Sequence, residues 1–213
     1  MRTEPTVFVV DDDAGVRDSL QTFLESAGLR VETYGSAEAF LAQVPGVPYG
    51  CLLLDLRMPG IDGLALQDRL LAQKIQLPII ILTGHGDVAA AVHALKGGAV
   101  DFLEKPFNTA TLLERIRQAL ALSAETQRQS STREHIKRRL AHLTAREREI
   151  LDMVVDGRSS KVIAIDLGIS ERTVELHRAR VKKKMGVRSV AELVRMMLAI
   201  RAPPPGPTRH PTN

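Results

Sequence analysis

The chain of 213 residues has room for one or two domains, and its 44% of apolar residues excludes disorder throughout. The single cysteine excludes an internal disulfide and a zinc–thiolate cluster. No apolar run reaches the roughly 18 residues of a membrane helix, and the first residues show no apolar stretch typical of a secretory signal. We therefore expect a cytoplasmic protein. Charge divides the chain, because residues 1–125 carry 10 basic and 16 acidic residues, a net of −6, whereas residues 126–213 carry 19 and 9, a net of +10.

Five short apolar runs alternate with amphipathic stretches in the acidic part. The runs are continuous rather than alternating, which is typical of strands buried on both faces of a parallel sheet. Gly28 is placed to end the first helix, Ser36 to cap the second, and Asn108 or Thr109 to cap the last. The pattern predicts an α/β fold, a doubly wound five-stranded parallel sheet of order 2-1-3-4-5. Its predicted strands cover residues 7–10, 30–34, 51–54, 79–82 and 99–103.

The rest of the chain is predicted to be helical. Residues 123–140 are almost all polar but lack Pro and Gly, which favours an exposed helical linker. Thr144 and Glu147 form a capping-box pattern, and Gly157, Gly168 and Gly186 separate four short helices, which predicts a small all-α bundle. We therefore expect an α/β domain at 1–122, a linker at 123–140, a small helical domain at 141–200, and a disordered Pro-rich tail at 201–213.

Acidic residues follow two strands that the predicted order makes neighbours. Asp11, Asp12 and Asp13 come directly after the first strand, and Asp55 comes directly after the third. Because ligands of doubly wound sheets bind at the carboxyl ends of the strands, these carboxylates are expected to converge. Clustered carboxylates repel one another unless a cation bridges them, so the pattern predicts a Mg²⁺ site.

Two further strands also end in polar side chains at the carboxyl edge of the predicted sheet. Thr83 follows the fourth strand and Lys105-Pro106 follows the fifth, so a hydroxyl and an ammonium are expected at the same edge. Either group can bind a phosphoryl oxygen. The Lys105–Pro106 bond is a candidate cis peptide.

Residues 5–122 resemble a response-regulator receiver domain in four motifs: VVDDD at 9–13, LLLDLRMPGIDG at 52–63, ILTGHGD at 81–87 and DFLEKPF at 101–107. The resemblance implies a bound Mg²⁺ and a sensor histidine kinase as the phosphoryl donor. The roles it implies are Asp55 as phosphoacceptor, Asp11, Asp12, Asp55 and the Arg57 carbonyl as metal ligands, Thr83 and Lys105 as phosphoryl-binding groups, and Phe102 as a switch aromatic. The alternative for Phe102 is plain core filling, and we favour the switch role.

A basic helix is predicted to begin after Ser170 and to end at Met185. Val174, Val181 and Met185 share one stripe, which we expect to face the core. The opposite stripe mixes Leu and Ala with acidic and basic side chains, as suits a surface that enters a DNA groove. Two helices joined by a Gly turn are the helix-turn-helix plan.

Residues 141–200 resemble the LuxR-type helix-turn-helix, and the whole chain is most similar to the FixJ branch of the NarL/FixJ regulators. Ser160 departs from the family, which usually has Asn before Lys161. The resemblance implies that Glu175, Leu176 and Ala179 face bases. It places Lys161, Thr173, His177, Arg180 and Lys183 near phosphates, although His177 could equally be a packing residue.

These features predict a DNA-binding transcription regulator, more often an activator, that is switched by phosphorylation, forms homodimers when phosphorylated and contacts RNA polymerase. Two alternative functions compete with this prediction. Asp11-x-Asp13 resembles the nucleophile motif of haloacid-dehalogenase-type phosphatases, but the chain shows no cap domain, so we expect no enzyme. A constitutive DNA-binding protein with a vestigial receiver is the other alternative, and the complete acidic set argues against it.

Overall fold

The computed structural model describes residues 4–43, 49–84 and 88–201, and these residues fold as two compact units. One unit extends to Gln127 and the second begins at Arg128. No helix in the described part of the chain is both long enough and apolar enough to cross a bilayer.

The first unit is built on a five-stranded parallel sheet with the order β2-β1-β3-β4-β5, which confirms the predicted topology. Its central strands are completely buried, whereas the edge strands β2 and β5 are partly exposed. The continuous apolar runs therefore belong to the strands that helices cover on both faces. The strands are β1 (Thr6–Val10), β2 (Arg30–Tyr34), β3 (Gly50–Asp55), β4 (Ile79–Thr83) and β5 (Asp101–Glu104).

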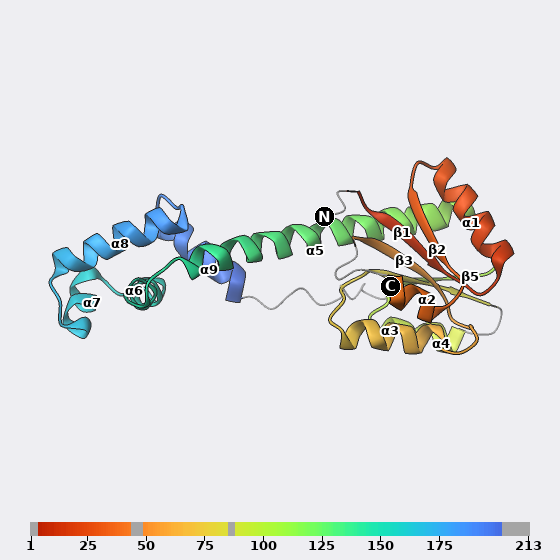
Figure 1. The fold of residues 1–213 in the computed structure, drawn as a ribbon, viewed down its shortest axis with the longest axis horizontal. Coiled ribbons are helices and arrows are strands. Elements are labelled where there is room, and N and C mark those ends of the chain that lie inside the picture. Colours follow the sequence, from red (N-terminus) through yellow and green to blue (C-terminus); the bar gives the residue numbers. More distant parts are fainter. Residues whose placement is uncertain (1–3, 44–48, 85–87, 202–213) are drawn as a thin grey trace. The chain divides into compact units, whose positions relative to one another are not determined.

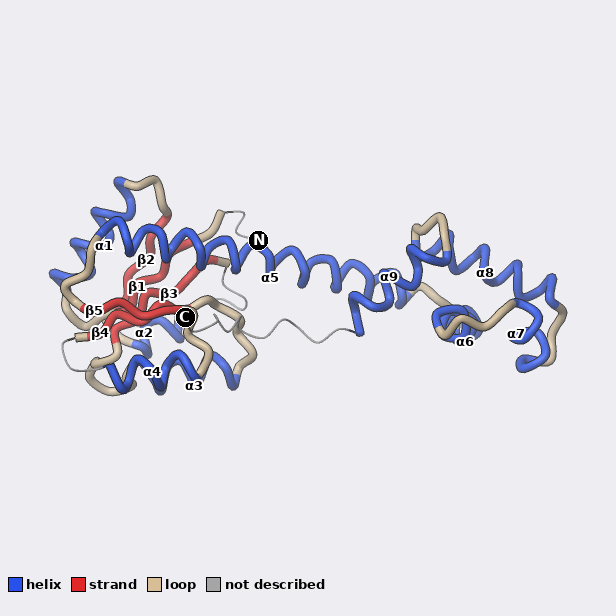
Figure 2. Tube along the Cα trace, turned by 180° about the vertical axis from the view of Figure 1, so that it is seen from behind, coloured by secondary structure: helices blue, strands red, loops and turns tan. Residues whose placement is uncertain are grey.

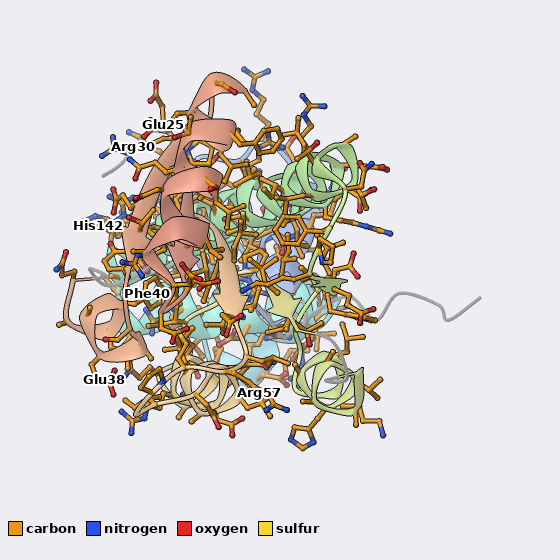
Figure 3. All side chains as sticks on the ribbon, turned by 90° about the vertical axis from the view of Figure 1, so that its right-hand side faces the viewer. Glu25, Arg30, Glu38, Phe40, Arg57 and His142 are labelled. Atoms are coloured by element: carbon orange, nitrogen blue, oxygen red, sulfur yellow. The ribbon has the colours of Figure 1, made fainter. Side chains whose placement is uncertain are left out.

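Helices cover both faces of the sheet (Figure 1). Helices α1 (Ala14–Ser26) and α5 (Thr109–Ala141) lie on one face, and α2 (Ala37–Gln43), α3 (Gly63–Ala72) and α4 (Val88–Lys96) lie on the other. The ring of Phe40, labelled in Figure 3, packs edge-on against Phe8 and Tyr34 beneath the second group. Two separate apolar cores thus fix the sheet and hold its carboxyl edge in place.

The last strand differs from its prediction. It begins at Asp101 rather than residue 99, because Ala99 donates its N–H to Ala94 at the end of α4 and so belongs to the turn. Ala99 is still buried, which explains why its apolar character suggested a strand. Asn108 is the residue that caps α5, since its side chain accepts the N–H groups of Ala110 and Thr111.

The second unit contains the four short helices α6 to α9 (Figure 2). Their buried apolar side chains form a core of their own. The Thr144–Glu147 capping box is present, and Gly168 and Gly186 end their helices in the left-handed conformation, as predicted. Gly186 has a φ of 62°, which glycine adopts without steric cost. The helices are α6 (Ala145–Val155), α7 (Ser160–Leu167), α8 (Glu171–Met185) and α9 (Val190–Arg201), so the helix extends one residue into the predicted tail. The rest of that tail, 202–213, lies outside the described residues.

The segment between the two predicted domains lies entirely within α5. Its ends take part in the two units, because Ser123 accepts the N–H of Gly50 in the first, and Ile136 is buried in the core of the second. Arg133 and Arg139 also donate hydrogen bonds to the carbonyl groups of Ala199 and Met185. Residues 133–141 are therefore part of the helical unit rather than an exposed connector.

Candidate functional site

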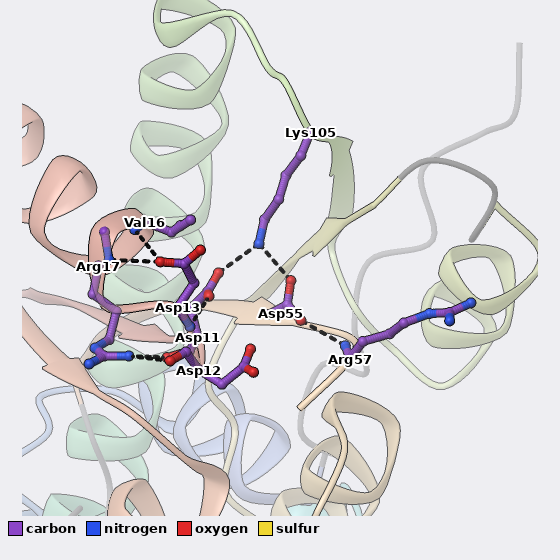
Figure 4. Close-up of polar contacts among 9 residues, drawn as sticks. Asp11, Asp12, Asp13, Val16, Arg17, Asp55, Arg57 and Lys105 are labelled. Carbon is purple, nitrogen blue, oxygen red and sulfur yellow. Dashed lines mark hydrogen bonds and ion pairs between the residues drawn. The ribbon is translucent and has the colours of Figure 1, made fainter. Parts of the chain in front are cut away.

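Lys105 contacts the carboxylate that follows β1 and the carboxylate of the last residue of β3 (Figure 4). Its Nζ lies 2.7 Å from Oδ2 of Asp11 and 2.7 Å from Oδ1 of Asp55. The backbone N–H of Arg57 donates to the other oxygen of Asp55 at 2.7 Å. Since Val10 pairs with Leu54, the two strands end together, and this brings residues 44 positions apart into one cluster. Both oxygens of Asp55 are thus oriented at the carboxyl edge of the sheet.

The loop after β1 is held by a residue that the sequence analysis did not select. Arg17, in the first turn of α1, donates through Nη1 to the carbonyl groups of Asp11 and Asp12 at 2.8 and 2.9 Å. Asp13 caps α1 by accepting the N–H of Gly15 and Val16. Asp13 therefore serves the helix, whereas Asp12 is exposed beside the buried Asp11.

Burial and the lysine act in opposite directions on the protonation of Asp55. Burial raises the pKa of Asp55, and the hydrogen bond and charge of Lys105 offset this only in part. Burial also lowers the pKa of Lys105, but the hydrogen bonds to Asp11 and Asp55 outweigh it, so that this pKa lies above its ordinary value. Lys105 therefore stays charged and partly neutralises two crowded carboxylates.

Asp11, Asp12 and Asp55 carry the carboxylate oxygens that a hard cation prefers, but they do not form a complete set of metal ligands. In the described ranges, no three carboxylate, imidazole or thiol groups are placed to hold a metal ion together, and the ammonium of Lys105 contacts both Asp11 and Asp55. Magnesium usually binds through one or two carboxylates and completes its shell with water and phosphate oxygens. Asp11, Asp12 and Asp55 supply that donor chemistry at adjoining strand ends.

Thr83 and Phe102 lie where the predicted order of strands places them. Thr83 ends β4 and is fully buried; its hydroxyl donates to the carbonyl of Gly84 at 3.3 Å, and its own carbonyl accepts the N–H of Lys105 at 2.8 Å. Phe102, in β5, is half-buried against the core beneath α3 and α4. The Lys105–Pro106 peptide is cis, as predicted.

The loop after Asp55 depends on two residues to which the sequence analysis gave no role. A Cβ on Gly63 would lie 2.4 Å from the carbonyl oxygen of Asp55, so a side chain there would displace the backbone of the site. Glu38 accepts the N–H of Ile61 at 3.2 Å and steadies the same loop from α2. Figure 3 labels Glu38 and Arg57 among the side chains of this unit.

In the second unit, α7, the turn at Gly168 and α8 form a helix-turn-helix. Val174, Val181 and Met185 are buried, as predicted. The residues predicted to meet DNA are mostly exposed, and Leu176 is 51% exposed although it is apolar. The exposed members of that set are Lys161, Glu175, Leu176, Ala179, Arg180 and Lys183.

Thr173 and His177 are only half-buried members of the predicted surface. Thr173 bonds with Ser170 at the start of α8, and Nδ1 of His177 is buried without a hydrogen-bond partner in the described part of the chain. Lys184 differs from Lys183, because it forms an ion pair of 2.6 Å with the buried Glu147. Of these two exposed lysines, Lys184 is paired within the helical unit and Lys183 belongs to the predicted DNA-facing set.

Comparison with known proteins agrees with the division of the chain into two units. Residues 7–117 match the response regulator receiver domain, and residues 141–197 match the luxR family of bacterial regulatory proteins. The transcriptional regulatory protein FixJ of Azorhizobium caulinodans is 50% identical over 192 residues, which cover 90% of this chain and 91% of that protein. FixJ of Bradyrhizobium diazoefficiens is 46% identical over 202 residues, which cover 95% and 98% of the two chains.

Solved structures agree in fold as well as in sequence. The response regulator StyR superposes with a TM-score of 0.83 at 43% identity, covering 92% of this chain and 99% of that one. Full-length FixJ from B. japonicum gives 0.58 at 44% identity, covering 94% and 98%.

The fold and the matched regions define a two-component response regulator with a receiver domain and a LuxR-type DNA-binding domain. Within that class, the chain belongs to the FixJ-like transcription regulators, whose activity is switched by phosphorylation. This is a family of regulators and not of enzymes, and receiver domains generally use Mg²⁺.

Proposed function

We propose that Asp55 accepts the phosphoryl group from a sensor histidine kinase and that Thr83 and Lys105 transmit the change. The observation that carries this assignment is the contact of Lys105 with both Asp55 and Asp11 at 2.7 Å. When Asp55 becomes an acyl phosphate, new anionic oxygens appear at this point, and an ammonium and a buried hydroxyl beside it can bind them. Phe102 then repacks on the same face.

Asp11, Asp12, Asp55 and the carbonyl of Arg57 are the groups proposed to hold Mg²⁺, which supplies electrostatic stabilisation for the transferred phosphoryl group. Arg17 keeps the Asp11–Asp12 backbone in place, and Asp13 stays with α1. The chain's own contribution is thus to orient one carboxylate and to neutralise the charge around it.

The downstream part of the proposal concerns DNA. Residues 1–122 act as the receiver and residues 141–200 as the DNA-binding domain. The segment 123–140 joins them, and its last part, from Arg133, packs with the helical unit. The phosphorylated chain forms a homodimer on DNA in the cytoplasm and activates transcription through RNA polymerase. Glu175, Leu176 and Ala179 face bases, whereas Lys161, Thr173, His177, Arg180 and Lys183 lie near phosphates. The support is the mainly exposed face of α8 and the similarity of the chain to transcriptional regulatory proteins.

Replacing Asp55 by Asn tests the phosphoacceptor. The Asp55→Asn chain has an amide in place of the nucleophilic carboxylate, so it should take up no label from radioactive acetyl phosphate in the presence of Mg²⁺. DNA binding by this variant should no longer increase on treatment with acetyl phosphate. Both effects are measured on the full chain by autoradiography and by a gel-shift titration.

Asp18→Asn is the matched control, because Asp18 is an exposed acid on α1 outside the cluster. It should label normally. Normal labelling of Asp55→Asn would show that another residue accepts phosphate. DNA binding of the unmodified chain that is already maximal would favour a constitutive regulator with a vestigial receiver.

A further inference from the structure

The two helices of the helix-turn-helix are joined by one serine hydroxyl. Ser160, the first residue of α7, is buried, and its Oγ donates to Oε1 of Glu175 on α8. Oγ of Ser160 also accepts a hydrogen bond of 2.7 Å from Nη1 of Arg178. A hydroxyl can donate once and accept as well, so both capacities of Ser160 are used between two residues of α8.

Glu175 is the unusual member of this network, because it is acidic on a surface that otherwise suits a polyanion. Its side chain is 60% exposed, yet Oε1 is fixed by Ser160 and lies 4.0 Å from Nε of Arg178. The guanidinium of Arg178 offsets the repulsion that DNA phosphates would exert on the carboxylate. Oε2 has no partner among the residues that the structure describes and so is available to a ligand.

An ionised carboxylate only accepts hydrogen bonds. In the major groove, the exposed donors on base edges are the amino groups of cytosine and adenine, and Glu pairs characteristically with the amino group of cytosine. A carboxylate that rotates freely must lose that freedom on binding, whereas one held at Oε1 has lost it already. Base discrimination by Glu175 therefore depends on what holds it.

We propose that Ser160 is a positioning residue for specificity: it holds Glu175 so that the free carboxylate oxygen reads a cytosine amino group in each half-site. The inference rests on the proposed role of Glu175 in facing bases. It assigns a function to Ser160, which lies on α7 and carries no DNA contact in the proposed set. Asn, which has a donor and an acceptor on one amide, can replace the hydroxyl in both bonds.

The test is selection of random-sequence duplex DNA by the full-length chain after treatment with acetyl phosphate and Mg²⁺. We expect one position of each half-site to prefer cytosine. Glu175→Ala should remove that preference, about tenfold, and Glu175→Gln should shift it towards adenine, the base that Gln pairs with. Glu171→Gln removes an exposed acid from the same helix and should leave the preference unchanged.

Ser160→Ala should lower the cytosine preference about three- to tenfold while binding to non-cognate DNA and its salt dependence stay within about twofold. When Ser160→Ala is added to Glu175→Ala, the cytosine preference should not change further, because Ser160 acts through the carboxylate of Glu175. Ser160→Asn should restore the preference. Thermal melting of each variant shows whether the helical unit is folded, and a merely structural role would weaken binding to all sequences equally.

Full cytosine preference in a folded Ser160→Ala chain, with loss in Glu175→Ala, overturns the positioning role and leaves base reading by Glu175 intact. Unchanged preference in Glu175→Ala overturns both the base-facing role of Glu175 and the inference built on it. A wild-type chain that selects no sequence at all contradicts specific DNA binding itself.

Discussion

Single amines neutralise buried carboxylates in both units. Lys105 binds Asp11 and Asp55 in the receiver, and Lys184 binds Glu147 in the helical unit at 2.6 Å. The surroundings differ, because an exposed acid, Asp12, lies next to the buried Asp11 in the receiver, whereas Oε2 of Glu147 accepts hydrogen bonds from both Lys184 and the N–H of Thr144. The first arrangement is the proposed phosphorylation site, and the second links α6 to α8.

The Glu147 tie predicts a dependence of stability on pH. The hydrogen bond from Lys184, and then that from the backbone of Thr144, hold the pKa of Glu147 below its ordinary value of 4.5. A lowered folded-state pKa stabilises the folded form above the unfolded pKa, and this stabilisation is lost as the pH falls through the folded pKa. We expect Glu147→Gln to lower the free energy of unfolding of the helical unit by about 1 kcal/mol at pH 7, because Gln keeps the capping bond but not the ion pair.

The measurement is urea unfolding of residues 128–213 at pH 7 and at pH 3. The difference between wild type and variant should shrink at the lower pH, because protonation of Glu147, as the pH falls through its lowered pKa, removes the ion pair with Lys184. Glu149→Gln removes an exposed pair with Arg146 and should matter little at either pH. An equal loss at both pH values would mean that packing, and not charge, makes Glu147 important.

Helix α8 divides its two functions between two faces. The buried stripe of Val174, Val181 and Met185 holds the helix on the core, and Arg139 from α5 donates to the carbonyl of Met185 at its end. The exposed face combines an apolar side chain, Leu176, with basic residues. The helix can therefore be rigid on one side and available to a groove on the other.

This division predicts two classes of variant. Arg180→Ala and Lys183→Ala should weaken binding to every DNA sequence and flatten the dependence of log affinity on log salt by about one unit for each phosphate that is no longer neutralised. Leu176→Ala should instead change the preferred sequence, because apolar atoms read the methyl group of thymine. Fluorescence-anisotropy titrations at several salt concentrations separate the two effects.

Lys184→Ala is the informative control, since its amine is paired with Glu147 rather than free for DNA. It should lower thermal stability more than it changes the salt dependence. Identical behaviour of the Leu176 and Arg180 variants would contradict the assignment of the exposed face.

At the scale of the whole molecule, the opposite charges of the two parts suggest self-inhibition. Residues 1–125 carry a net charge of −6 and residues 126–213 a net of +10. Exposed ion pairs are weak and screened by salt, so attraction alone is not enough, and docking must also be steric. Phosphorylation shifts the equilibrium between the docked and the free helical unit by the difference in docking free energy between the phosphorylated and the unphosphorylated receiver. We expect the unphosphorylated chain to bind DNA more weakly than its helical unit alone.

The comparison uses residues 128–213 rather than a fragment from 141, because Ile136 and Arg139 belong to the helical unit. At matched salt and matched dimer concentration, the fragment should bind more tightly than the unphosphorylated chain, and acetyl phosphate should restore binding by the full chain. Equal affinities would mean that phosphorylation acts through dimerisation alone.

The strands and most helix ends could be predicted from the sequence alone, because these follow from local signals, and the doubly wound class of the fold then implied the strand order. Continuous apolar runs mark buried parallel strands, and Thr144, Gly168 and Gly186 act through their own backbone neighbours. Asp11, Asp55 and Lys105 were predictable as one cluster because the ends of parallel strands must meet at one edge.

The pairing of polar groups across the fold could be seen only once the elements were packed together. No local sequence pattern reveals the partners of three side chains. Arg17 binds the loop after β1, Lys184 binds Glu147, and Ser160 lies between Glu175 and Arg178. The same is true of Ala99, whose apolar character fits a strand or a buried turn equally well. Local patterns record which face of an element is buried, whereas the partner of a side chain depends on which elements pack together.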